Sequence, residues 1–285
     1  MIVITDSLAL APTADDNPLN TPVFGWQSLA TGIAATSEDA DHPASFLLNA
    51  STALRWQAAD EGSPLGPPAA DQYLTATIET SDSLDYLAIA AHNLGSGQNT
   101  VSVEASDGGS PETWTEIVTE RLLSTDEPAI FRWTPTSYAG VRLRIQPSAL
   151  SETPTTPFVA VMHVGKLLVM PRGISGDEHM PINLGRRKVT LNNRSETGQF
   201  LGRFLLSQSR STSLAFKYLE DSWYRSTMDP FIDAASTDTP FFVAWKPTER
   251  PRDVGYCWLT GDPDPQWHRP TGTMGVTLQI SGIGV

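Results

Sequence analysis

The stretch that decides the fold is Asp85 to Gly109, DYLAIAAHNLGSGQNTVSVEASDGG. Its first ten residues are nearly all apolar, which is typical of a central strand buried on both faces. The GSGQN segment that follows predicts a turn. Beyond it, Val101, Val103 and Ala105 alternate with polar residues, so one face of a second strand points toward a core. We therefore predict a central pair of strands in a β-sandwich.

The same pattern continues on both sides of this stretch. Upstream, YLTATIET (73–80) alternates with period two, and no helical stripe of ten or more residues appears between 70 and 170. In GVRLRIQP (140–147) the apolar residues face the core, while Arg142 and Arg144 face outward. Short strands separated by turns every ~8–12 residues predict a sandwich or jelly roll. The other predicted strands are WTEIVTE (114–120), AIFRWT (129–134) and FVAVMHVGKLLVMP (158–171).

The second half of the chain predicts a smaller β domain with one helix. EDSWYRSTMDPFIDAAS (220–236) is the helix, because acidic residues open it and Asp229–Pro230 suits a helix start. FLGRFLLSQSRSTSLAFKYL (200–219) predicts two strands around a polar SQSRST turn. Three further strands are expected in PFFVAWKP (240–247), GYCWLTG (255–261) and GTMGVTLQISGIGV (272–285).

Turn residues cluster in MPRGISGDEHMP (170–181), which suggests a domain boundary. We predict a mainly β protein in three parts. Residues 1–22 form an N-terminal arm or edge strand, 23–172 a jelly-roll domain, and 173–285 the smaller β domain with the helix.

Charge is unevenly spread over the 285 residues, whose net charge is −13. Residues 1–150 carry 5 Lys and Arg against 19 Asp and Glu, and residues 151–285 carry 14 against 13. An acidic surface argues against binding to a nucleic-acid backbone, which needs clustered cations. The N-terminus lacks the basic and apolar segments of a signal peptide, and no stretch approaches the ~18–20 apolar residues of a membrane span. We expect a soluble protein made in a cytoplasm.

Catalytic and metal motifs are weak. His92 is followed by Ser102, Ser106 and Asp107, but no strained nucleophile turn surrounds either serine, so a strand-end histidine is favoured over a hydrolase triad. GDEHMP (176–181) predicts a loop rather than a metal site, because consecutive residues rarely converge on one ion. The acidic segment TSEDADHP (36–43) does not match a calcium loop. We expect no enzyme activity, no cofactor and no metal.

Two groups of residues are candidates for contact with other molecules. Trp267 and His268 lie in the loop-like DPDPQWHRP, and together with His92 they are possible contacts for a partner or a glycan. Tryptophan in β domains more often belongs to a core or a subunit interface. A subunit interface is therefore predicted around Arg186, Arg187, Phe241, Trp245 and Trp258.

Residues 25–170 resemble the discoidin-like (galactose-binding-like) jelly rolls. The segment LAIAAHNLGSGQNTVSVEASDGGSPETWTEI (87–117) carries the resemblance, with Val101, Val103, Ser106, Asp107 and Trp114 in the family's strand pattern. YAGVRLRIQP (138–147) is similar to a later strand. The chain lacks the family's usual terminal cysteines, since its one cysteine is Cys257. The resemblance implies a β-sandwich whose loops are the place to look for a ligand.

The second half is similar to distal tail and tail-tip structural proteins of siphophages. The run from Arg210 to Pro270 matches their pattern of strand, aromatic helix, PFFVAWKP and GYCWL. This resemblance implies a hexameric or trimeric ring in the virion tail, beside the tail tube and the tail-tip hub, with the jelly roll facing outward. The alternative is a carbohydrate-binding module for attachment to a host surface. A hydrolase of cell-wall glycans, with two carboxylates in a cleft, is a third possibility.

Overall fold

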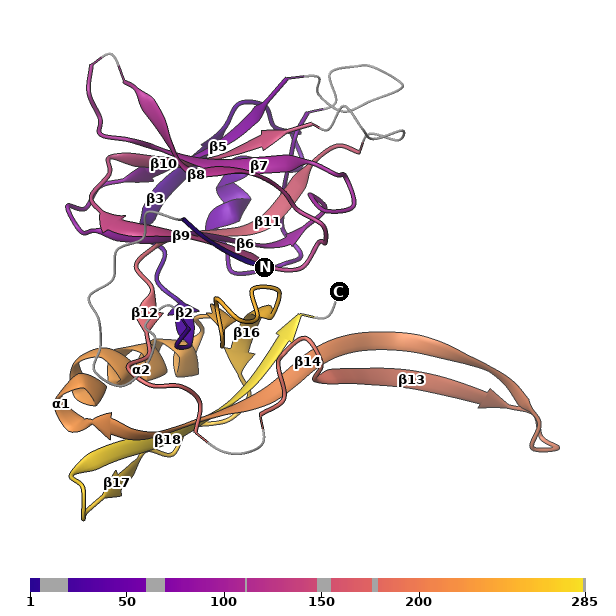
Figure 1. Cartoon of the computed structure of the whole chain (residues 1–285). Coiled ribbons are helices and arrows are strands. Elements are labelled where there is room, and N and C mark those ends of the chain that lie inside the picture. The colour runs from indigo at the N-terminus through magenta and orange to yellow at the C-terminus, as the bar shows by residue number, and fades with distance from the viewer. Residues whose placement is uncertain (6–19, 60–69, 111, 148–154, 176–178, 284–285) are drawn as a thin grey trace.

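The structure of the protein is a computed structural model that describes residues 1–5, 20–59, 70–110, 112–147, 155–175 and 179–283. It is mainly β, as predicted, and its strands form three sheets (Figure 1). Two five-stranded sheets face each other and make a sandwich. A third sheet lies below the sandwich and carries the helix and a long, projecting pair of strands.

The sandwich confirms the predicted architecture. One sheet has the order β1-β9-β6-β11-β4 and the other β3-β5-β10-β7-β8. Their apolar faces enclose a common core that includes Trp56, Leu87, Val103, Phe131 and Leu143. The strands are β1 (Ile2–Ile4), β3 (Ala30–Ala35), β4 (Trp56–Gln57), β5 (Gln72–Ile78), β6 (Leu84–His92), β7 (Thr100–Ser106), β8 (Trp114–Leu122), β9 (Ala129–Thr136), β10 (Gly140–Gln146) and β11 (Phe158–Gly165), with the short 3-10 helix η1 (Ala44–Leu48) between β3 and β4.

The stretch Asp85 to Gly109 forms β6 and β7, but these strands do not pair with each other. β6 is the middle strand of one sheet, between β9 and β11, while β7 lies in the facing sheet between β10 and β8. The connection therefore crosses the sandwich. Asp126 stabilises the crossing because its Oδ1 accepts hydrogen bonds from the amides of Gly95 and Ser96, at 2.9 and 2.8 Å.

The third sheet has the order β12-β2-β15-β16-β18-β14-β13, and β17 pairs with β18. β2 (Val23–Gly25) and β12 (Leu168–Val169) pair here, although both fall in the range 23–172 assigned to the jelly roll. Apart from β1, which precedes β2 and pairs with β9, the sandwich is thus inserted between two strands of the third sheet, β2 and β12. Such short apolar runs show no periodicity, so the sequence does not indicate their distant partners. The remaining strands are β13 (Arg186–Arg194), β14 (Phe200–Glu220), β15 (Phe241–Ala244), β16 (Val254–Leu259), β17 (Gln266–His268) and β18 (Thr273–Ile283).

The region of the predicted turn SQSRST lies inside one continuous strand. β14 runs through 21 residues, and its polar segment pairs with both β13 and β18. The prediction of two strands around a turn is therefore wrong. Residues 203–220 contain no Gly, Pro, Asn or Asp, and polarity alone does not bend a strand that is paired on both sides.

The helix forms where the sequence predicts it. It comprises α1 (Asp221–Trp223), one π turn, η2 (Tyr224–Met228), and α2 (Asp229–Thr237), which has Pro230 in its first turn. Phe231 of α2 is fully buried against Phe24 of β2 and Phe241 of β15, with ring centroids 5.1 Å from each. The helix therefore covers one face of the third sheet.

An apolar layer joins the sandwich to the third sheet. Tyr86, Ala88 and Ala90 point from β6 toward Phe242 and Tyr256 of the third sheet, and all of them are buried. Between Asp85 and His92, β6 is apolar because its other face lines the sandwich core. Two polar contacts also connect the sandwich with the third sheet. The Tyr256 hydroxyl donates to the carbonyl of Ala50 at 2.8 Å, and Arg210 forms an ion pair with Glu127 at 2.8 Å.

His163 lies inside this layer and packs edge-on against the rings of Phe242 and Tyr256, at centroid distances of 5.3 and 6.2 Å. Burial lowers the pKa of His163 to about 4, so the ring is neutral in the folded protein near pH 7.

We predict that His163 makes folding sensitive to mild acid. Between pH 6.5 and 4 the unfolded chain binds a proton at this residue that the folded protein does not, so its contribution to stability falls as the pH falls. From pH 7 to pH 5 the free energy of unfolding should drop by about 2 kcal/mol more in the native protein than in a His163→Gln variant. Urea unfolding at both pH values measures this difference. An equal drop in both proteins would contradict it.

Candidate functional site

The most unusual feature of the surface is a two-stranded ribbon, defined here as residues 186–194 of β13 and 200–208 of β14. β14 pairs with β18 from Ser209 onward, while its first nine residues pair only with β13. Nine extended residues span about 30 Å. Figure 1 shows the ribbon projecting from the body, away from the sandwich.

Large apolar side chains cover the ribbon and are open to solvent. Seven of them are 50–66% exposed. Phe204 and Leu205, which are consecutive residues in regular register with β13, point to opposite faces because side chains alternate along a strand. A two-stranded ribbon is marginal by itself, and exposed apolar patches of this kind mark interaction sites. The seven are Val189, Leu191, Phe200, Leu201, Phe204, Leu205 and Leu206.

The ribbon is also basic. Arg186, Arg187, Lys188 and Arg194 are exposed on β13, and within the described residues none of the four has an ion-pair partner. Arg203 donates from Nε to Oδ1 of Asn192 at 2.7 Å across the two strands. The residues Arg186 and Arg187, predicted at a subunit interface, thus lie at the base of the ribbon.

The three aromatic residues of the predicted interface lie elsewhere. Phe241 is fully buried in the core of the third sheet, so its side chain is not accessible to another subunit, which corrects that expectation. Trp245 stacks on His179 at 4.7 Å and donates from Nε1 to Asp253 at 3.0 Å. Trp258 is 40% exposed on β16.

The predicted contact residues do not form one site. Trp267 and His268 lie on β17, with Trp267 49% exposed and the His268 ring 6.0 Å from that of Tyr218. Tyr218 has a positive φ of 59°, which marks the bulge where β14 passes this corner. His92 lies in the sandwich, at the end of β6.

His92 borders an open cavity of about 640 Å³ at the junction of the sandwich and the third sheet. The Arg55 guanidinium lies 4.3 Å from the centroid of the Phe158 ring, and its Nη2 donates to Gln57 at 3.2 Å. Ala91 adopts a left-handed φ of 50°, a strained conformation for a residue with a Cβ. The lining residues are His42, Thr52, Ala53, Arg55, Ala91, His92, Asp126, Phe158, Ala160 and Ile283.

Both ring nitrogens of His92 are engaged by the backbone. Nε2 lies 3.1 Å from the carbonyl oxygen of Glu127, and Nδ1 accepts from the amide of Leu94 at 3.3 Å. Burial lowers the pKa of His92 to about 4, so it is neutral near pH 7. Ser102 and Ser106 belong to β7 in the facing sheet, and no hydrogen bond joins either to His92 in the described part of the chain. The described residues therefore hold no Ser-His pair there.

The residues considered for metal binding show no such site. His179 lies against Trp245, while Asp177 and Glu178 fall outside the described residues. Among the residues that are described, no group of three His, Cys, Asp or Glu side chains is placed to hold an ion. In the same part of the chain, no helix is long and apolar enough to cross a membrane.

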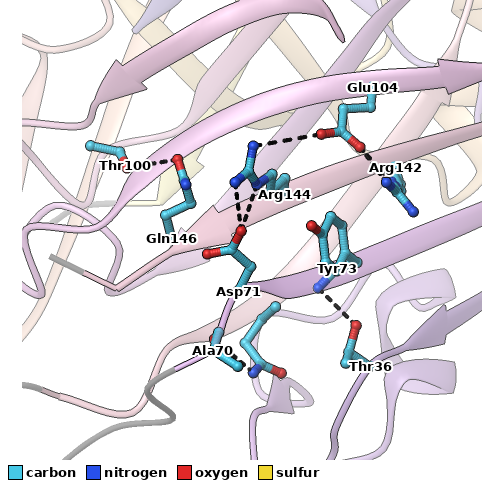
Figure 2. A network of polar contacts seen from close by, with 10 residues as sticks. Thr36, Ala70, Asp71, Tyr73, Thr100, Glu104, Arg142, Arg144 and Gln146 are labelled. Atoms are coloured by element: carbon cyan, nitrogen blue, oxygen red, sulfur yellow. Dashed lines mark hydrogen bonds and ion pairs between the residues drawn. The ribbon is translucent and has the colours of Figure 1, made fainter. Parts of the chain in front are cut away.

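The outer face of the sandwich carries charges that are already paired (Figure 2). Arg142 lies between the rings of Tyr73 and Trp114, at 4.2 and 4.3 Å, and donates from Nε to Glu104 at 2.6 Å. Arg144 pairs with Asp71 at 2.6 Å. These contacts join β10 to β7 and β5, and they confirm that both arginines face outward. The cations of the ribbon differ from this network, because they have no ion-pair partner among the described residues.

No protein-family model matches the chain, and no curated protein sequence matches it. Among solved structures, a point mutant of chitosan-binding module 1 from a Paenibacillus sp. IK-5 chitosanase/glucanase is 17% identical, with a TM-score of 0.40, over 49% of this chain and 98% of that chain. A Clostridium perfringens CBM32 in complex with GalNAc-β-1,3-galactose is 14% identical, with a TM-score of 0.39, over 49% and 99%. The CBM32 of AlyQ, in complex with 4,5-unsaturated mannuronic acid, is 16% identical, with a TM-score of 0.35, over 47% and 94%.

These neighbours are carbohydrate-binding modules of the discoidin-like class, the class that the sequence resemblance names for the jelly roll. TM-scores of 0.40 or lower are too low for this similarity to support a conclusion about fold or function. The sandwich is established by the strand order of the two sheets.

Proposed function

We propose that this chain is a non-enzymatic structural subunit that assembles with further copies of itself through the ribbon. The observation that carries the proposal is the ribbon itself: a projecting, two-stranded element with large apolar side chains exposed on both faces. Burying one such side chain stabilises an assembly by about 1.5–3 kcal/mol. In a single subunit these side chains stay exposed to water, so this stabilisation is absent.

A second copy is the occupant that we favour, because the ribbon is basic whereas residues 1–150 carry an excess of 14 acidic side chains (19 against 5). The ribbon of one subunit and the acidic domain of the next are complementary in charge. A contact between two different surfaces is heterologous, and it closes into a ring when the rotation between subunits permits.

We place this assembly in a bacteriophage tail, as part of a hexameric or trimeric ring at the distal end or tail tip. Support comes from the resemblance of residues 210–270 to siphophage distal tail proteins and from a domain arrangement that suits a ring. The third sheet and the ribbon would build the ring beside the tail tube and hub proteins, and the sandwich would face outward. The subunit would be made in the host cytoplasm.

Polar substitutions in the ribbon should weaken assembly. We expect the native protein to have a mass that is a multiple of 30.9 kDa, and Phe204→Ser combined with Leu206→Ser to shift it toward one subunit by removing apolar contact area. The measurement is size-exclusion chromatography with light scattering over a range of concentrations.

Leu48→Ser is the control for an exposed apolar side chain, because Leu48 is 46% exposed but lies in η1 of the sandwich, outside both the ribbon and β8. It should leave the assembled mass unchanged. A native protein that stays monomeric at the highest concentration would contradict the proposed assembly.

Glycan binding by the sandwich is the second candidate function, and the junction cavity favours it. The cavity is concave and open, and it combines an aromatic ring, an arginine and hydroxyl groups. Arg55 has no carboxylate partner within the described residues, whereas Asp126 is engaged by two backbone amides. This arrangement suits an acidic saccharide on a host surface. The sugars seen in the structural neighbours belong to those proteins.

If the cavity binds acidic saccharides, trigalacturonic acid should bind measurably better than neutral N,N′,N″-triacetylchitotriose in isothermal titration calorimetry. Arg55→Ala should weaken that binding at least about tenfold, the loss of one charge-assisted contact. Arg121→Ala is the control, because Arg121 is exposed on β8 outside the cavity. Equal affinity for both sugars, or no effect of Arg55→Ala, would rule this site out.

A further inference from the structure

We infer that strand β13 of one copy docks along strand β8 of the sandwich in the next copy, an inference that rests on the proposed assembly. Both strands end a sheet, so alternate backbone N–H and C=O groups along each lack a strand partner within the described residues. Such edges pair readily with another chain by strand addition.

Length and charge together distinguish β8 from the other free edges of the sheets. β8 and β13 each contain nine residues. The edge strands β1, β3, β4, β12 and β17 contain three, six, two, two and three. Residues 200–208 of β14 form an edge as long as β8, but they include Arg203 and no carboxylate. β8 is therefore the acidic edge that can pair with the whole of β13.

The charges of the two edges are opposite. Glu112, just before β8, and Glu116 and Glu120 within it are exposed and have no ion-pair partner among the described residues. Arg121 of β8 is exposed as well, so the edge carries three carboxylates against one cation. β13 offers Arg186, Arg187, Lys188 and Arg194, which are unpaired as well. Opposite charges on adjacent strands stabilise pairing, while like charges oppose it, so β13 of one copy does not favour β13 of another.

Apolar surface accompanies the acidic edge. A groove of about 200 Å³ lies between β8 and β1, and its lining includes Val3, Ile117 and Val118. Leu122, at the end of β8, is 55% exposed. The exposed Val189 and Leu191 of β13 would meet this surface in a docked pair.

The contact is between copies rather than within one chain. The ribbon projects from the third sheet, whereas β8 belongs to the sheet of the sandwich that is farther from the third sheet (Figure 1). Each subunit therefore offers one basic edge and one acidic edge, the arrangement that a ring or a filament requires.

Charge reversal tests the pairing. One variant carries Arg187→Glu and Lys188→Glu in β13, and the other carries Glu116→Lys and Glu120→Lys in β8. Each should raise the concentration needed for assembly at least about tenfold, because like charges then face each other. All four changes in one chain should restore assembly toward the native level, which a variant that merely misfolds would not do.

Asp41→Lys combined with Glu79→Lys is the matched control, since it changes the net charge of the acidic domain equally at exposed sites outside β8. It should assemble like the native protein in sedimentation velocity. Native-like assembly of the β8 variant, or failure of the fourfold variant to recover, would overturn the docking surface. If the docking surface is overturned, loss of assembly in the Phe204→Ser, Leu206→Ser variant would still support the proposed function. A native protein that is monomeric would contradict both the proposed function and the docking surface.

Discussion

The apolar layer between β6 and the third sheet is the contact on which the rest of the structure depends. Tyr86 is fully buried there, and its hydroxyl donates to the carbonyl of Gln27 at 2.6 Å. Gly25 allows this approach, because a Cβ at that position would lie 2.7 Å from the Tyr86 ring. The layer holds the inserted sandwich on the third sheet, so the basic ribbon and the acidic β8 edge are displayed on different parts of one molecule.

The contrast between satisfied and unsatisfied surfaces points to the function of each part. On the outer face of the sandwich, Arg142 and Arg144 are stacked or paired within one subunit, whereas Glu116 and Glu120 of the edge strand β8 have no ion-pair partner among the described residues. The ribbon has exposed leucines and phenylalanines and unpaired cations, and a single subunit gives them nothing to contact. This difference is the basis for the proposed assembly through the third sheet, and the junction cavity is where we propose that a ligand of the sandwich binds.

Local periodicity predicted much of the fold. β5, β6, β7, β9 and β10 appear where alternation or apolar runs indicated them, and the helix forms at 221–237. The long-range features were not predictable in this way. β6 and β7 lie in different sheets because the packing of both sheets, rather than the turn, decides the pairing. β2 and β12 are too short to show a pattern.

The ribbon was not predicted, because GRRKV (185–189) was interpreted only as a basic cluster at an interface and SQSRST (207–212) as a turn. The available signal was the absence of turn-forming residues from 203 to 220. Of the candidate contact residues, only His92 lies at the cavity, and the sequence gives no hint that Arg55 and Phe158 join it. Such convergence of distant segments depends on tertiary contacts.

Hydrogen–deuterium exchange at high and low protein concentration tests the central claim most directly. If a second copy covers the ribbon, the outward amides of β13 will exchange slowly in concentrated protein and rapidly after dilution, since only the assembled state gives them partners. The same dependence on concentration is expected along β8. Equally rapid exchange of the β13 amides at every concentration would contradict the account.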